Sequence, residues 1–192
     1  KPLGTEVISP ALPPGAVKPI AIAGKVTYHA PNAASGVKFQ YRDGGGSRRV
    51  TEMQGDVTHP SWSPDGERIV FDAFRDSTWN LWVVDLRTGE VEQLTRGRAG
   101  AGEFARHPSW APDGRAIAFD SRRDGNPEIY VLHIEDGESH RITTDPAWDT
   151  HPVWAPDGRT IAFSSDRGSD AHDLWAMNGD GSAARRLAAR PG

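Results

Sequence analysis

The feature that most constrains this chain is an eight-residue string that occurs three times. His-Pro-Ser-Trp-Ser-Pro-Asp-Gly at residues 59–66 returns as His-Pro-Ser-Trp-Ala-Pro-Asp-Gly at 107–114 and as His-Pro-Val-Trp-Ala-Pro-Asp-Gly at 151–158. A spacing of about 45 residues is typical of proteins in which each repeat is one supersecondary unit. The string therefore predicts a row of similar units that bury their apolar faces against one another.

Each unit continues in the same way after the string. A short apolar run such as residues 68–71 follows the Pro-Asp-Gly turn, a polar link leads to a second run such as 81–85, and a further turn precedes a final segment such as 91–95. Pro presets φ, Asp hydrogen-bonds nearby backbone N–H groups and Gly accepts positive φ, so these triplets favour tight turns. Four strands joined by such turns make an antiparallel meander with the length of a β-propeller blade.

The composition agrees with many turns and no helix. The 192 residues include 21 Gly and 15 Pro, and no segment carries the apolar 3.6-residue period of a helix. We predict an all-β fold, a β-propeller of about four four-stranded antiparallel blades with a degenerate first blade, which forms a small closed ring or part of a larger assembled propeller. Residues 1–17 are predicted to be a Pro-rich lead-in and residues 18–192 the propeller, with blades at about 18–51, 52–98, 99–143 and 144–192.

Charge and hydropathy exclude two classes of partner. Lys and Arg number 22 against 26 Asp and Glu, which gives no broad attraction for nucleic acid. No apolar stretch approaches the 18 residues of a membrane-spanning helix. The chain begins at Lys1 rather than Met, which suggests a removed leader or a fragment of a longer protein.

The repeated histidines are the candidate metal ligands. His59, His107 and His151 begin the first strand of each unit, and the first strand lines the central channel of a propeller. Three imidazoles that meet at one mouth of the channel would suit a divalent metal ion. The opposing interpretation is that each ring caps its own blade, because a repeat puts the same residue at the same place for structural reasons alone.

The tryptophans divide into two groups. Trp62, Trp110 and Trp154 recur at one position of the repeat, where a large ring fills the space between neighbouring sheets. Trp79 and Trp148 fall outside this register, in what we expect to be links between strands, and are the candidate residues for binding a ligand or partner.

The block His-Pro-x-Trp-x-Pro-Asp-Gly-x-x-Ile-x-Phe, followed by an Arg-Asp link and Ile/Leu-Tyr/Trp, resembles the WD-repeat-like β-propeller repeat of TolB-type periplasmic proteins. It is also similar to the propellers of prolyl-oligopeptidase-like peptidases. The resemblance implies a periplasmic or secreted protein that docks other proteins of the cell envelope. TolB-type propellers have around six blades and follow a separate α/β domain, and this chain departs from them in both respects.

We therefore expect a non-enzymatic binding module that presents one face or its channel mouth to a protein, peptide or glycan. One alternative is a metal-dependent, lyase-like propeller enzyme that uses the channel histidines. Another is a fragment or propeller domain of a larger protein, such as a prolyl-oligopeptidase-like peptidase, although no Gly-x-Ser-x-Gly nucleophile motif is present. An open array of blades would leave apolar flanks, so we also expect a homo-oligomer in that case.

Overall fold

The computed structural model describes residues 38–40, 47–51, 53, 55–98, 102–168 and 171–188. This part of the chain is all-β and contains no helix, as predicted. The strands are β1 (Lys38–Gln40), β2 (Ser47–Arg49), β3 (Val57–Trp62), β4 (Arg68–Arg75), β5 (Thr78–Asp85), β6 (Val91–Gln93), β7 (Ala105–Trp110), β8 (Ala116–Ser121), β9 (Glu128–His133), β10 (Ser139–Arg141), β11 (Asp149–Trp154), β12 (Thr160–Ser165), β13 (Asp173–Asn178) and β14 (Arg185–Ala188). The predicted lead-in over residues 1–17 lies outside the described residues.

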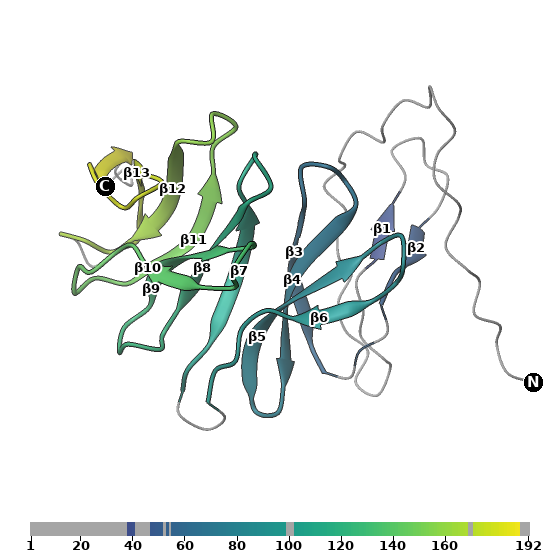
Figure 1. The fold of residues 1–192 in the computed structure, drawn as a ribbon. Helices are drawn as coiled ribbons and strands as arrows, with labels where there is room; N and C mark the ends of the chain where they lie inside the picture. The colour runs from purple at the N-terminus through teal and green to yellow at the C-terminus, as the bar shows by residue number, and fades with distance from the viewer. Residues whose placement is uncertain are drawn as a thin grey trace, which may run out of the picture.

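Three four-stranded antiparallel sheets follow one another along the chain, each a meander of consecutive strands. The first sheet comprises β3–β6, the second β7–β10 and the third β11–β14, and Figure 1 shows them side by side. β1 and β2 form a two-stranded antiparallel pair in the region of the predicted degenerate blade. The predicted blade architecture is confirmed for the three complete copies of the repeat.

Turn chemistry explains why the strands end where they do. In each Pro-Asp-Gly turn the Asp carboxylate accepts a hydrogen bond from the backbone N–H two residues later, at 2.9 Å for Asp65, 2.9 Å for Asp113 and 2.8 Å for Asp157. The following Gly has positive φ in all three turns, for example 75° at Gly66. The turn predicted from the sequence is therefore formed by the groups expected to form it.

Side chains alternate between the two faces of every sheet, as the pleat requires. Ile117 and Phe119 of β8 pack toward the first sheet, against Val70, Leu81 and Val83. Ala116 and Ala118 of the same strand pack toward the third sheet, in a cluster that includes Phe163. Residues on both faces are buried because the second sheet lies between two others.

The repeated tryptophans lie in these interfaces. Trp110 is 6% exposed within the cluster between the first and second sheets. Trp154 packs on the cluster between the second and third sheets, and Trp62 on the cluster at the other face of the first. Their predicted packing role is confirmed.

The first strands β3, β7 and β11 lie along the inner edge of the row, where β7 contacts both β3 and β11. Among the described strands, those of the third sheet contact only the second sheet. The third sheet exposes three large apolar side chains, those of Val153, Leu174 and Leu187. Val153 and Leu174 lie on its outer face, away from the second sheet. No helix in the described part is long and apolar enough to cross a membrane.

Candidate functional site

Three histidine rings meet at the inner edge of the sheets, and we call them the histidine cluster (His59, His107 and His151). The ring centroids of His59 and His107 are 4.2 Å apart, and those of His107 and His151 are 3.7 Å apart with the rings stacked. His59 and His151 are separated by 6.4 Å. The convergence inferred from the repeat is therefore present, with His107 in the centre.

A β-bulge aims each ring toward the others. The register of the first and second strands shifts after Thr58, Arg106 and Thr150, the residues that precede the three histidines. The histidines themselves have φ of 45°, 52° and 54°, in the left-handed region that non-glycine residues seldom adopt. Such backbone strain costs about 1–3 kcal/mol per residue and is concentrated at functional sites. Bulges in turn redirect side chains next to such sites.

A buried carboxylate on the second strand holds two of the rings. His59 Nδ1 lies 3.0 Å from Asp72 Oδ2, and His107 Nδ1 lies 2.6 Å from Asp120 Oδ1. An ionised carboxylate only accepts hydrogen bonds, so Nδ1 carries the proton in both rings and Nε2 keeps a free lone pair in the neutral form. Each of these rings is thus bonded within its own sheet, but its partner is a side-chain carboxylate and not the backbone group that the capping interpretation expects.

The same carboxylates also link neighbouring sheets. Asp72 accepts a hydrogen bond from the backbone N–H of His107 at 3.4 Å, and Asp120 accepts one from the backbone N–H of His151 at 3.0 Å. The third copy has Ser164 at the position of the two aspartates, so the ring of His151 has no such carboxylate in its own sheet.

The surroundings favour a charged Asp72 and a neutral His151. Burial alone would raise the pKa of the Asp72 carboxyl, but hydrogen bonds from His59 and Thr58 and the charge of Arg106 hold that pKa below its usual value. Partial burial, and next the charge of His107, lower the pKa of His151. An imidazole with a lowered pKa is neutral at pH 7, which is the form that binds metals.

Beside the cluster, a cation is held over an aromatic ring. The Arg106 guanidinium lies 4.1 Å from the ring centroid of Trp79, while its Nε donates to Asp72 Oδ2 at 3.1 Å. The ring of Phe74, which is 41% exposed, lies 5.6 Å from that of Trp79. We call Phe74, Trp79 and Arg106 the Trp79 platform. Phe74 and Arg106 could not be identified from the repeat, because they occupy positions where the other copies have different residues.

The expected placement of Trp79 in a link is wrong. Trp79 is the second residue of β5 and pairs with Phe74 of β4. β4 and β5 continue to a two-residue turn at Asp76 and Ser77, whose φ angles of 50° and 65° match the twist of a hairpin. The link expected from the other copies is therefore shorter here, and Trp79 is half-buried.

The other residues predicted from the sequence lie apart from the cluster. Trp148 is in the segment before β11, as expected, and is 50% exposed. Asp149, the first residue of β11, is buried and pairs with Arg167 and Ser165. The Asn-Gly-Asp-Gly string at 178–181 forms the turn between β13 and β14, with Asp180 bonded to the N–H of Ser182 at 2.9 Å.

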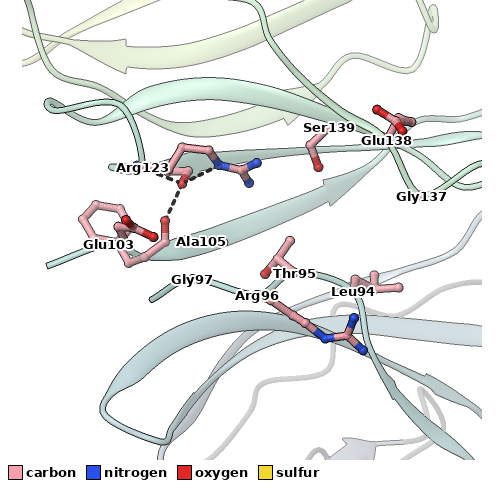
Figure 2. Close-up of a pocket in the computed structure, with 12 residues that line it drawn as sticks. Leu94, Thr95, Arg96, Gly97, Glu103, Ala105, Arg123, Gly137, Glu138 and Ser139 are labelled. Atoms are coloured by element: carbon pink, nitrogen blue, oxygen red, sulfur yellow. Dashed lines mark hydrogen bonds between the residues drawn. The ribbon is translucent and has the colours of Figure 1, made fainter. Parts of the chain in front are cut away.

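Pockets between sheets are also present in the described part of the chain. One of about 450 Å³ separates the first sheet from the second, and Figure 2 shows the segment with Leu94, Thr95 and Gly97 facing Arg123 and Ser139 across it. Within it the Ser121 hydroxyl donates to the Phe104 carbonyl at 2.6 Å. A second pocket of about 790 Å³ lies beside the Pro-Asp-Gly turns of the second and third sheets. The histidine cluster lines neither pocket.

A family model and a curated relative both relate this chain to TolB. The model of the TolB beta propeller domain matches residues 25–191. The Tol-Pal system protein TolB of Marinomonas sp. is 38% identical over 80 residues, which are 40% of this chain and 18% of that protein.

Solved structures of TolB proteins also resemble this chain. TolB from Acinetobacter baumannii superposes with a TM-score of 0.68 and 29% identity, covering 78% of this chain and 36% of that one. The putative TolB from Agrobacterium tumefaciens gives a TM-score of 0.70 and 25% identity, covering 80% and 56%. The chain thus spans less than two thirds of the length of each of these proteins.

Proposed function

Because this chain belongs to the TolB beta propeller domain family, we propose that it is a binding module that presents the inner end of its sheets to a segment of a protein partner. The contact surface would be the Trp79 platform together with the adjacent histidine cluster. A metal-dependent lyase-like enzyme and the propeller of a larger peptidase remain predictions from the sequence.

The observation that carries the proposal is the dual anchoring of Arg106. Its guanidinium is fixed by Asp72, whose side chain is fully buried, and stacks on Trp79. A side chain held in this way loses little conformational entropy when a partner binds. Trp and Arg are also the residue types that dominate binding energy at protein interfaces. The platform is thus a preorganised aromatic and cationic surface.

The chemistry of the platform indicates what it would bind. Phe74 and Trp79 offer apolar area for an aromatic or aliphatic side chain. The half-buried edge of Arg106 offers N–H groups to carbonyl or carboxylate oxygens, and Nε2 of His59 and His107 offers a lone pair to an N–H or O–H donor. An extended peptide supplies both kinds of group. We therefore propose a protein segment rather than a glycan, and a location in the cell envelope, which the Tol-Pal names of the relatives support.

A displayed library of random peptides tests this proposal. Wild-type protein should enrich a peptide family, and fluorescence polarisation should show that Phe74→Ala and Trp79→Ala weaken its binding by about 30-fold, the equivalent of the ~2 kcal/mol of a hot-spot side chain. Trp148→Ala is the matched control, because it removes another exposed aromatic side chain, from the segment before β11 and outside the platform. Peptides that bind all four proteins equally would refute the platform as the binding surface.

We also propose that the outer face of the third sheet pairs with the same face of a second chain. The strand registers put Val153 and Leu174 on this one face, and Leu187 of β14 is also exposed. In the other sheets, the Ser61 and Ser109 hydroxyls accept hydrogen bonds from the backbone N–H groups of Trp110 and Trp154 in the next sheet, at 3.3 and 3.1 Å.

The third copy replaces this serine with Val153 and the linking aspartate with Ser164. The face therefore lacks the polar groups that join one blade to the next, and its apolar character suits a symmetric contact with itself.

A further inference from the structure

The second and third sheets bring three potential ligand groups together beside the histidine cluster. One ligand atom from each of His107, Asp120 and His151 lies within 4.8 Å of the others, and this is the one such group of three among the described residues. The sequence predicted a set of three histidines. The structure replaces His59, whose ring is 6.4 Å from that of His151, with Asp120.

An independent observation concerns the second oxygen of Asp120. The residue is 1% exposed, and its Oδ2 is buried without a hydrogen-bond partner in the protein. A buried carboxylate oxygen that lacks a partner costs free energy, so native proteins normally provide one. The partner of Oδ2 is thus a group that the described protein does not supply.

The equivalent aspartate of the first sheet shows what is missing. Asp72 accepts a hydrogen bond from Thr58 and pairs with the Arg106 guanidinium of the next sheet. In the second copy, the residue at the position of Thr58 is Arg106, which is committed to Asp72. In the third copy, the residue at the position of Arg106 is Thr150, which carries no charge. Asp120 therefore lacks both the hydroxyl and the cation that compensate Asp72.

We propose that His107, His151 and Asp120 bind a divalent transition-metal ion, for which Zn²⁺ is the best fit. Two imidazole nitrogens and one carboxylate are a ligand set that Zn²⁺ accepts in proteins, with a fourth position left for water or for a group from a partner. Ca²⁺ and Mg²⁺ fit poorly, because they prefer six or more oxygen ligands. The metal ion would supply beside Asp120 the positive charge that Arg106 supplies beside Asp72. It would also provide a reason for the strained backbone of two residues that aim their rings at the same point.

The test needs no protein partner, so its result is separate from that of the proposed function. Protein treated with a chelator and then desalted is titrated with Zn²⁺ by calorimetry, and with Co²⁺ as a visible-absorption probe of nitrogen ligation. We expect one equivalent to bind to wild-type protein. His151→Ala and Asp120→Asn should each weaken binding at least about 10-fold, the lower bound for losing a residue that orients a metal ligand.

The matched control is His140→Ala. His140 is exposed like His151 and its ring lies 5.6 Å from that of His133, so it tests whether any surface pair of histidines binds the ion. This variant should bind Zn²⁺ as wild type does. Because the ring of His151 is exposed, His151→Ala should keep the wild-type circular dichroism spectrum. If it does not fold, the Co²⁺ spectrum of wild-type protein still tests the site. No stoichiometric binding to wild type, unchanged affinity in a folded His151→Ala variant, or Ca²⁺ binding as tight as Zn²⁺ binding would overturn the proposal.

Discussion

Asp120 accepts a hydrogen bond from the backbone N–H of His151, which lies 31 residues further along the chain in the next sheet, at 3.0 Å. The same oxygen of Asp120 holds the ring of His107 at 2.6 Å. One carboxylate thus fixes a ring in its own sheet and the strained backbone of the neighbouring sheet. Asp72 does the same for His59 and His107. The histidine cluster is therefore part of what joins the sheets, and the rings of His59 and His107 are held in place before any ligand binds.

Replacing Asp72 should destabilise the protein strongly. Asp72→Ala leaves Arg106 without its carboxylate and removes the partners of the His59 ring and the His107 N–H. Loss of one member of a buried ion pair costs about 3–5 kcal/mol. Urea denaturation should show a loss of this size. Asp136→Ala, in an exposed turn, should cost less than about 1 kcal/mol. Equal losses of stability in Asp72→Ala and Asp136→Ala would mean that the bonds of Asp72 to the second sheet contribute little to the stability of the fold.

The turn aspartates should make stability depend on pH. Hydrogen bonds from the N–H groups of Arg159 and Thr160 lower the pKa of Asp157 in the folded state. The stabilisation from its charge is therefore present above the unfolded pKa of about 3.9 and is lost as the pH falls through the lower, folded pKa.

Asp157→Asn keeps the shape of the side chain and lacks the charge, so the difference in urea midpoint between wild type and variant should shrink as the pH falls from about 5 to about 3. Carboxyl NMR titration measures the same pKa directly. A value for Asp157 at or above the usual one would contradict this prediction.

Replacing either of two glycines of positive φ by alanine should destabilise the protein, by different amounts. A Cβ at Gly158 meets nothing within 4 Å, whereas one at Gly181 would lie 2.1 Å from the carbonyl oxygen of Ile142, the residue that follows β10. Gly158→Ala should therefore cost only the backbone strain, about 1–2 kcal/mol. Gly181→Ala should cost a further amount of about 1–3 kcal/mol, because sheet packing must shift. Thermal unfolding compares the stability of the two variants. Similar losses of stability would contradict the prediction, because they would show that the turn at Gly181 moves away from Ile142 at little cost.

The sequence was sufficient to predict the blades, and the reason is physical. The Pro-Asp-Gly turns are local, since Asp65, Asp113 and Asp157 bond to N–H groups two residues away. Convergence of the histidines also followed from the repeat, because equal positions in neighbouring blades come close in space. Differences between the copies could not be interpreted without the structure. Arg106 and Thr150 occupy one position, and only the three-dimensional arrangement shows that Arg106 compensates Asp72 and that Asp120 has no equivalent cation. Trp79 was misplaced for the same reason, because its hairpin is tighter than the links of the other copies.

The outer face of the third sheet should control the oligomeric state. Leu174 is 47% exposed and Val153 is 58% exposed on this face. If two chains pair through it, light scattering should give twice the 20.8 kDa of one chain for wild-type protein. Leu174→Glu would bring two carboxylates into the contact, where each charge would have to lose water without a partner, and should give the mass of one chain.

The control is Trp148→Glu, which introduces the same charge at a site of similar exposure, 50%, outside this face. It should leave the larger mass unchanged. If wild-type protein has the mass of one chain, the pairing is excluded. Pairing through this face is also excluded if both Leu174→Glu and Trp148→Glu have the mass of one chain, since the effect would then come from added charge in general.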